Sequence, residues 1–452
     1  MSLSHFLQQL RQICENSRNN ENGGIFNDLL SIDLNKESTI IGISNLQNDL
    51  IGQNDDQITQ VIESLNLFDG DWGAFNSLAI DYLKLCRDFD PWSILKSHDL
   101  FLQYYNSLTI SLLNNQFGNN LAILMFETTK YLVPLMKRLD VILNANVKGK
   151  QFKRLIFLST NLTKLFNHLR ALKGQSQKKK LIIFIVNNLN KIYFIISNPL
   201  LCANIFANMN LANLKLHGFP KSQQVEYRYI LGRFYLIKNQ LHRAYHHLNW
   251  SFQNSNSNEY ENNIKILRYL IPTSLLVGKI PSKRLLSKFP EFQQLYIPLI
   301  RHLVNGNHFE FQQHLKQNES YFKSKKLLIL LAQKSKIIIF RNLFSKVTGL
   351  TNAVSRLYFS HLQLALMKSI RSSQEQISEF GDQYMYQLLN ESIDFSFVEN
   401  IAVSLIENGL IRGNNIPHMQ LILIPKTNTF PDIFQSYSKA YPIPNNESWM
   451  DL

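Results

Sequence analysis

Apolar side chains recur at helical spacing through most of this 452-residue chain. From about Ile58 to about residue 370 they follow an i, i+3, i+4 pattern, as at Leu78, Tyr82 and Leu85. This pattern is typical of amphipathic helices that bury one face. Glycine and proline are scarce, with 17 and 13 copies, about half of average usage. The sequence therefore predicts an all-α protein and disfavours a turn-rich β protein.

One stretch has the character of a helical hairpin. Residues 229–248 reproduce the Leu-Gly-x-x-Tyr and Ala-x-x-x-apolar spacing of a tetratricopeptide-type repeat. The small side chains at Gly232 and Ala244 allow two antiparallel helices to approach closely. Residues 303–315, with a Gly-Asn turn, predict a second hairpin. We therefore expect a TPR-like α-solenoid of helical hairpins over residues 58–325.

The C-terminal part has the pattern of a winged helix, which we assign to residues 326–435. Its three helices are expected to include residues 337–344, 355–367 and 397–407. A small β-ribbon is expected to follow, with strands at 410–412 and 420–424 and a turn at 413–415. Residues 1–57 are rich in Asn, Gln and Ser and predict a loosely structured N-terminal extension, while 436–452 form a C-terminal tail.

Charge is distributed unevenly along the chain. The net charge is +14, but residues 1–130 hold 7 basic and 16 acidic residues, and residues 351–452 hold 6 and 10. Residues 131–350 hold 34 basic and 7 acidic residues, and no carboxylate occurs between Asp140 and Glu226. One run of lysines often only solvates a helix. A whole segment of this charge instead predicts a polyanionic partner.

The third winged-helix helix does not have the composition of a base-reading helix. Its polar face carries Glu399 and Glu407 and no Lys or Arg, and carboxylates repel phosphates. We expect this region to contact a partner protein through Glu399, Asn400, Glu407, Asn408, Arg412, Gln420 and Ile422. We expect basic residues near this helix and upstream of it to contact phosphates without recognising the base sequence. These are Lys323, Lys325, Lys326, Lys334, Lys336, Arg341, Lys346, Arg356, Lys148, Lys150, Lys153, Arg154, Lys178, Lys179 and Lys180.

No motif indicates catalysis, a metal or a cofactor. Three widely separated cysteines support neither a disulfide framework nor a zinc site. His242 and His246 share a helical face, but the Glu of a His-Glu-x-x-His site is missing, so we interpret these histidines as packing or surface residues. Phosphate-cradling, dinucleotide and serine-nucleophile motifs are also missing. No apolar window predicts a membrane span.

Several longer motifs carry a resemblance to a known family. They are 86–93 (Cys-Arg-Asp-Phe-Asp-Pro-Trp-Ser), 99–101, 227–235 (Tyr-Arg-Tyr-Ile-Leu-Gly-Arg-Phe-Tyr), 270–272 with 278–282, 340–344 (Phe-Arg-Asn-Leu-Phe), and the run from Val398 to Pro431. Together they resemble the fungal PCI-domain subunit of the nuclear mRNA-export (TREX) complex, and the resemblance spans residues 75–431. The N-terminal extension has no counterpart, and 371–394 is longer than a simple turn.

The resemblance implies a place for the chain in the cell. It implies a non-catalytic scaffold that pairs with a large PCI subunit, binds a small, very acidic subunit of the Sem/Dss type, and works at the nuclear pore of the nuclear envelope. It also implies an RNA- or DNA-binding surface and a link between transcription and export. A sibling PCI subunit associated with the COP9 signalosome shares much of the C-terminal pattern. An alternative is therefore a COP9-type subunit whose basic zone serves only protein assembly.

Overall fold

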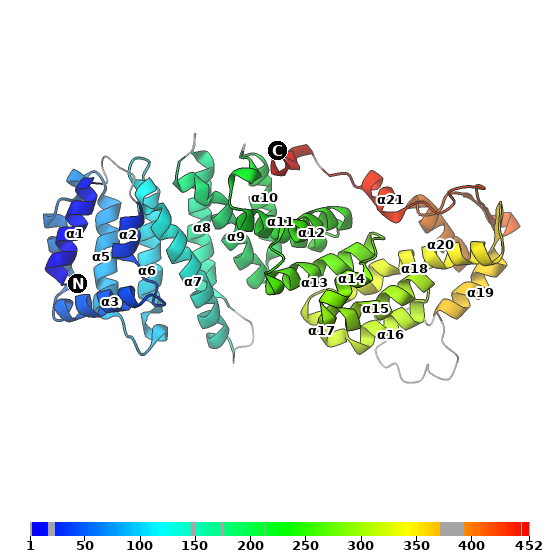
Figure 1. Ribbon diagram of the computed structural model, residues 1–452, viewed down its shortest axis with the longest axis horizontal. Coiled ribbons are helices and arrows are strands. Elements are labelled where there is room, and N and C mark those ends of the chain that lie inside the picture. Colours follow the sequence, from blue (N-terminus) through cyan, green and yellow to red (C-terminus); the bar gives the residue numbers. More distant parts are fainter. Residues whose placement is uncertain are drawn as a thin grey trace. The chain divides into compact units, whose positions relative to one another are not determined.

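The computed structural model describes residues 2–16, 23–145, 151–172, 176–212, 214–370, 393–443 and 445–451. The chain divides into two compact units (Figure 1). Unit 1 contains Met1–Ile230 and Ser448–Leu452, and unit 2 contains Leu231–Glu447. This division differs from the expected boundaries after residues 57, 325 and 435. None of the helices in the described ranges combines the length and hydropathy that crossing a bilayer requires.

Unit 1 is a stack of helices, coloured blue to green in Figure 1. Its helices are α1 (Leu3–Asn16), α2 (Gly23–Leu30), α3 (Glu37–Leu50), α4 (Asp55–Ser64), α5 (Gly73–Asp88), α6 (Ile94–Leu112), α7 (Ala122–Leu143), α8 (Lys153–Ala171), α9 (Ile182–Ile195) and α10 (Cys202–Asn210). Helix α11 (Lys221–Ile237) contributes residues to both units. Short 3₁₀ turns occur at Leu67–Gly70, Gly118–Leu121, Lys178–Leu181, Pro199–Leu201 and Leu216–Gly218.

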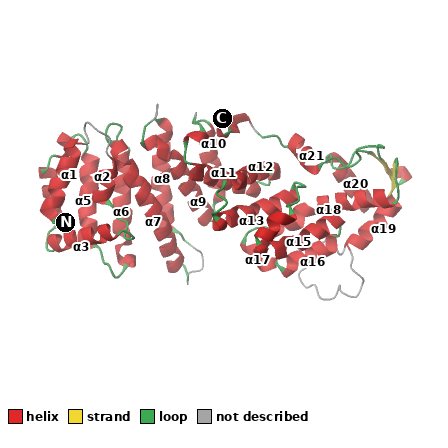
Figure 2. Ribbon diagram, in the orientation of Figure 1, coloured by secondary structure: helices red, strands yellow, loops and turns green. Residues whose placement is uncertain are grey.

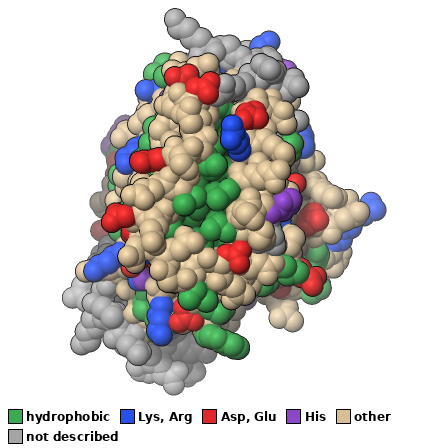
Figure 3. Space-filling view, turned by 90° about the vertical axis from the view of Figure 1, so that its left-hand side faces the viewer, with side chains coloured by type: hydrophobic (Ala, Val, Ile, Leu, Met, Phe, Trp, Pro, Cys, Tyr) green, Lys and Arg blue, Asp and Glu red, His purple; other side chains and the backbone are tan. Residues whose placement is uncertain are grey.

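The expectation of a loosely structured N-terminal extension is wrong. Phe6, Leu10 and Cys14 lie at i, i+4 and i+8 on one face of α1, and all three are buried. The Phe6 ring stacks on Tyr82 of α5, with 5.7 Å between ring centroids. The apolar positions of this polar segment thus have helical spacing, which is sufficient for packing. Figure 3 shows the end of unit 1 that carries these helices, where hydrophobic side chains form a central strip with scattered charges around it.

Unit 2 begins with helical hairpins and ends with a small sheet (Figure 2). Its helices after α11 are α12 (Leu241–Asn254), α13 (Tyr260–Leu276), α14 (Lys283–Lys288), α15 (Pro290–Asn305), α16 (His308–Gln317), α17 (Glu319–Ser324), α18 (Leu328–Leu350), α19 (Phe359–Ile370), α20 (Phe395–Glu407) and α21 (Ile433–Ala440). Its strands are β1 (Arg356–Tyr358), β2 (Asn414–Ile416) and β3 (Leu421–Leu423), and a 3₁₀ turn covers Pro417–Met419.

Both predicted hairpins are confirmed. A Cβ atom added to Gly232 of α11 would lie 2.7 Å from Cγ of Leu248 in α12, so only glycine permits this close approach. Gly306 joins α15 to α16 with a φ of 70°, a left-handed conformation that glycine adopts without strain. An added Cβ there would lie 2.8 Å from Cα of Leu343 in α18. Gly306 therefore also allows α18 to pack against the hairpin turn.

The winged helix is confirmed with a different sheet. Helices α18, α19 and α20 match the three expected helices, but the sheet has three antiparallel strands in the order β1-β3-β2. Residues 410–412 are not a strand, and the expected turn residues Asn414 and Asn415 belong to β2. Residues 356–358, expected in the second helix, form β1 and alternate exposed, buried, exposed, which is the period of a strand.

The C-terminal residues are docked rather than a free tail. They form α21 and a 3₁₀ helix at Asn445–Met450. In unit 1 the Trp449 indole donates to Oδ1 of Asn210 at 2.8 Å and lies edge-on to Tyr227. In unit 2 Glu447 is buried and accepts a hydrogen bond from the Tyr235 hydroxyl. The three cysteines are free thiols and buried.

Candidate nucleic-acid interface

The end of α17 and the turn that follows it present three of the expected lysines. Lys323 is 76% exposed, and its Nζ lies 3.8 Å from Glu319 one turn earlier. Lys325 is half-buried, with Nζ 6.0 Å from the centre of the Tyr321 ring. Lys326 is exposed in the turn. An exposed ion pair of this kind is weak, so the positive charges remain available to an anion.

Helix α18 carries two further candidates near its start. Lys334 is exposed, whereas Lys336 is half-buried. Its charge acts on His308, the first residue of α16, which is 5% exposed. Burial, and secondarily the charge of Lys336, lower the pKa of His308 to about 3. His308 is therefore neutral at physiological pH and adds no charge to the surface.

Arg341 has a structural role, contrary to its assignment as a phosphate contact. Its Nη2 donates to the carbonyl oxygens of Phe430 and Pro431 at 3.2 and 3.0 Å, and its Nη1 donates to Asn342. Burial lowers the pKa of Arg341, and the charge of Asp432 partly opposes this. The guanidinium thus fixes the segment after β3 to α18, which leaves little of it to meet a phosphate.

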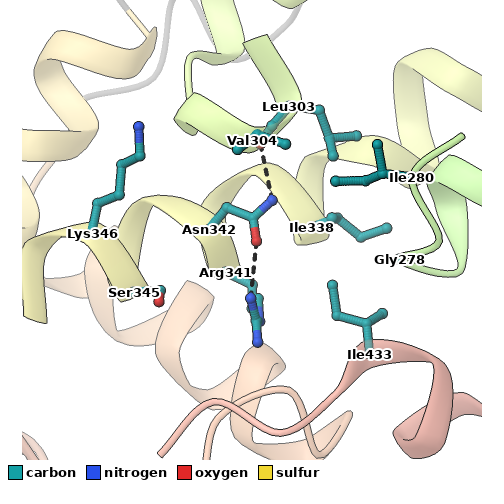
Figure 4. A pocket seen from close by; sticks show the side chains of 10 residues that line it. All are labelled: Gly278, Ile280, Leu303, Val304, Ile338, Arg341, Asn342, Ser345, Lys346 and Ile433. Atoms are coloured by element: carbon teal, nitrogen blue, oxygen red, sulfur yellow. Dashed lines mark hydrogen bonds between the residues drawn. The ribbon is translucent and has the colours of Figure 1, made fainter. Parts of the chain in front are cut away.

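Lys346, one turn beyond Asn342 on α18, stands at the edge of a pocket of about 250 Å³ (Figure 4). Its side chain is exposed, and Nζ donates to Oδ1 of Asn305 at 2.7 Å. Arg356 lies on β1, exposed on the outer face of the sheet, and pairs in register with Leu423 of β3. Lys346 and Arg356 therefore remain candidates for phosphate contact.

Three of the five candidates that the structure describes in unit 1 are part of its internal structure. Nη1 of Arg154 lies 3.2 Å from Asp140, a fully buried carboxylate. Lys178 is 1% exposed and donates through Nζ to the carbonyl oxygen of Asn114 at 2.7 Å. Lys179 is half-buried and donates to the carbonyl oxygen of Leu172 at 2.8 Å. Lys178 is too buried to meet a phosphate, contrary to its assignment, while the charges of Arg154 and Lys179 are engaged by a buried carboxylate and by a carbonyl oxygen.

The other unit 1 candidates differ from these three. Lys153 and Lys180 are exposed. Lys148 and Lys150 lie outside the described residues, as does the acidic stretch 371–392. In this part of unit 1, basic residues that bind other groups of the protein thus alternate along the chain with basic residues that are exposed to solvent.

The outer side of α20 carries the expected partner residues. Val398, Ala402 and Leu405 are buried against the winged-helix core. Asn400, Glu407 and Asn408 are exposed, and Glu399 accepts a hydrogen bond from Nδ2 of Asn415 at 3.2 Å. The exposed side of α20 is therefore polar to acidic, as the sequence predicts.

Ile422 cannot contact a partner, because it is fully buried between Leu357 and Asn415 in the sheet. Successive strand residues point to opposite faces, so its neighbour Leu423 is 38% exposed instead. Arg412 and Gln420 are exposed, as expected. Sequence reasoning missed Leu423 and the adjacent exposed Met419. No alternation in the sequence identifies them, because Leu421, Ile422 and Leu423 are all apolar and Met419 lies in the turn before the strand.

The histidines of α12 are packing residues. His242 is buried against the Phe434 ring, and Nε2 of His247 lies 3.1 Å from Glu447. Burial raises the pKa of Glu447, but the hydrogen bond and charge of His247, together with the Tyr235 hydrogen bond and the charge of Arg243, hold the pKa below its usual value. Across the described ranges, no three His, Cys, Asp or Glu side chains are grouped to hold a metal ion.

Two comparisons with known proteins bear on the identity of this architecture. PCI domain-containing protein 2 homolog of Dictyostelium discoideum is 30% identical over 257 residues, which is 57% of this chain and 54% of that protein. Nuclear mRNA export protein THP1 of Saccharomyces cerevisiae is 30% identical over 448 residues, which is 93% of this chain and 96% of that protein. The chain belongs to the PCI-domain family of nuclear mRNA export proteins.

PCI-domain membership accounts for the order of elements, in which a helical solenoid leads into a winged helix. The match to THP1 extends beyond residues 75–431, to which the sequence resemblance was limited. A "Protein CSN12 homolog" of Gibberella zeae is also similar, at 27% identity over 57% of this chain and 56% of that protein. No family model matches the chain.

Proposed function

We propose that this protein is a non-catalytic scaffold subunit in nuclear mRNA export that binds nucleic-acid backbones without strong sequence specificity. One observation carries the proposal. Lys326, Lys334 and Arg356 are exposed in unit 2, and within the described part of the chain none of them forms an ion pair. Lys323 and Lys346 extend this set, which we call the unit 2 cation set. Such cations bind phosphates by charge and read no bases.

The acidic outer side of α20 supports a second part of the proposal. Glu407 and the neighbouring Glu399 repel phosphates, whereas Leu423 and Met419 offer exposed apolar surface for protein contact. We infer that this winged-helix side pairs with a larger PCI subunit. A small acidic subunit and a location at the nuclear pore are further proposals that rest on the sequence resemblance, and the similarity to the nuclear mRNA export protein THP1 supports the nucleus alone.

Charge reversal tests the nucleic-acid part. In the triple variant Lys326→Glu, Lys334→Glu, Arg356→Glu, we expect binding to unrelated RNA and DNA strands to fall at least tenfold. A triple variant at Lys238, Lys265 and Lys288, exposed in the same unit, changes the net charge equally and serves as the control. Equal loss in both variants would show a response to net charge alone and would contradict the assigned surface.

A COP9-type assembly is the second candidate, favoured by the similarity to the CSN12 homologue. In that case the unit 2 cation set contacts protein only. Capture of the tagged protein from nuclear extract, followed by mass spectrometry, distinguishes the two at once. An export scaffold among the captured chains supports the proposed function, whereas COP9 subunits without export factors refute it.

A further inference from the structure

The pocket beside Lys346 has two chemically different walls (Figure 4). Ile280 of the α13–α14 loop, Ile338 of α18 and Ile433 of α21 form the apolar side. Asn342, Ser345 and Lys346, successive polar residues of α18, lie on the other side. The volume of about 250 Å³ is just below the roughly 300–1,000 Å³ of pockets for drug-sized ligands. The pocket has room for one ring system and not for a larger ligand.

The amide of Asn342 is held in one orientation. Its Nδ2 donates to the carbonyl oxygen of Leu303 at 3.0 Å, and its Oδ1 accepts from Nη1 of Arg341 at 3.1 Å. Arg341 is itself fixed by the carbonyls of Phe430 and Pro431. A side-chain amide has two donor hydrogens and two acceptor sites. One donor hydrogen and one acceptor site of Asn342 therefore remain for a ligand.

A ligand that fits this pocket would place a flat or apolar body against the isoleucine wall. Its polar edge would form hydrogen bonds with both the donor and the acceptor of Asn342. Nucleobase edges have this composition, and Asn is a common partner for them. An aliphatic side chain of a protein would cover the apolar wall but leave the remaining donor and acceptor of Asn342 unpaired. The chemistry of the walls thus favours a base.

Several cations surround the pocket, together with the exposed carboxylate of Asp432, which precedes the lining residue Ile433. Lys346 stands at its rim, and Arg301 is exposed one turn before the lining residue Val304 on α15. Lys279 follows Gly278 of the pocket lining, with Nζ 4.7 Å from the centre of the Phe434 ring. No carboxylate lines the pocket among the described residues. A strand whose base enters the pocket thus meets cations for its adjacent phosphates.

We propose that this pocket binds a single unpaired nucleobase of an RNA or DNA strand whose flanking phosphates lie on Lys346 and the neighbouring cations. The inference rests on the proposed nucleic-acid function and adds a preference for single strands. A base in a duplex is stacked and paired, and it must be unstacked and unpaired before it can enter a pocket. Duplexes therefore bind this protein through the phosphate contacts alone.

The test uses the full chain and three labelled probes: a 12-nucleotide single strand, the same strand with abasic sites at its central positions, and the 12-base-pair duplex. The wild type is expected to bind the intact strand at least about fivefold more tightly than the abasic strand, because the abasic sites remove the base that the pocket would hold. Val304→Trp places an indole in the pocket and is expected to abolish this difference without changing duplex binding.

Ile297→Trp is the matched control, because Ile297 is 41% exposed on α15 and Val304 is 40% exposed, and Ile297 does not line the pocket. It is expected to keep the wild-type discrimination. Ile280→Trp, in a loop position that is 54% exposed, fills the pocket from the opposite wall and repeats the test if Val304→Trp unfolds the helix.

Equal affinity of the wild type for the intact and abasic strands overturns the proposal of a base pocket. If all three probes still bind in a salt-dependent way, the proposed function stands without the pocket. Discrimination that survives both filling variants also overturns it. Loss of a co-purified protein partner in these variants, with discrimination intact, assigns the pocket to protein recognition instead. Failure of every probe to bind at low salt removes the proposed function itself.

Discussion

The basic residues that open α8 and occupy 178–180 in unit 1 are largely engaged inside the fold, whereas those of α17, α18 and β1 in unit 2 mostly point to solvent. In sequence both regions are rich in lysine and arginine and poor in carboxylates. In unit 1 the cations complete turns: Lys178 binds carbonyls at the end of α6, and Arg154 binds a buried Asp140. In unit 2 Arg341 is engaged in this way, through the carbonyls of Phe430 and Pro431.

The difference shows that segment charge predicts an anionic partner but not which cations meet it. A helix end leaves carbonyl oxygens without partners, and a nearby lysine can satisfy them. Gly118 makes this possible in unit 1, because an added Cβ would lie 2.4 Å from the carbonyl oxygen of Leu112 and 3.4 Å from Nζ of Lys178. Exposed helix faces such as that of Lys334 offer no such carbonyls. Of the surviving phosphate candidates, Lys334 and Lys346 lie within α18, Arg356 lies on β1, and Lys326 lies in a turn where it is exposed.

The largest effect is expected from Arg154→Met. The substitution leaves the buried Asp140 carboxylate with the backbone N–H of Leu155, at 3.0 Å, as its donor. Breaking a buried ion pair on one side costs about 3–5 kcal/mol, and urea denaturation measures this loss of unfolding free energy. Lys153→Met, at the exposed neighbour, is expected to change stability by less than about 0.5 kcal/mol. Equal stability of the two variants would remove the distinction between engaged and exposed cations.

Lys178→Met is expected to cost about 1–3 kcal/mol, the penalty of leaving a buried carbonyl without a donor. Burial lowers the pKa of Lys178, as it does for a cation removed from water. The exposed Lys180, two residues on, gives the control variant Lys180→Met, which is expected to match the wild type. Thermal unfolding of the three proteins side by side provides the measurement. A stabilised Lys178→Met would mean that desolvation outweighs the carbonyl contacts.

His308 extends the comparison to a buried titratable group of unit 2. Its imidazole is affected first by burial and second by the charge of the half-buried Lys336. The pKa of His308 falls from 6.5 to about 3 on folding, so between these values the unfolded chain binds a proton that the folded chain does not. Stability is therefore lost as the pH falls below 6.5, by about 2 kcal/mol between pH 7 and pH 5. Denaturation curves of wild type and His308→Gln at both pH values test this. A wild-type loss no larger than that of the variant would contradict it.

Local patterns account for what the sequence predicts correctly. The hairpin of α11 and α12 follows from Gly232 and its spacing to Ala244, and α20 follows from its apolar face. The packing of α1 was also visible, at Phe6, Leu10 and Cys14, but the polar composition around it masked the signal. The spacing of apolar residues thus predicts a helix even where the average composition of the segment is polar.

Contacts between distant residues account for the rest. Arg341 meets carbonyls 89 and 90 residues later, and Lys178 meets carbonyls 64 and 66 residues earlier. Nothing in the spacing of either residue announces these partners. The strand register of Ile422 similarly depends on β1, which precedes it by more than sixty residues. The folded structure, and not the local sequence, therefore determines which basic residue is accessible to a ligand.

The smallest effects are expected from single neutralisations in the unit 2 cation set. Each phosphate contact that is removed lowers the slope of log affinity against log salt by about 0.7 for a single strand. Lys326→Gln and Lys334→Gln are each expected to show this change, and Lys288→Gln, at an exposed lysine outside the set, is expected to keep the wild-type slope. Fluorescence titration of one labelled strand from 50 to 200 mM salt measures all four proteins.

Arg154→Met completes the series. If this variant folds at the assay temperature, it is expected to retain the wild-type slope, because the Arg154 guanidinium does not contact the phosphates. A lower slope in Arg154→Met with unchanged slopes in the unit 2 variants would reverse the comparison between the two regions.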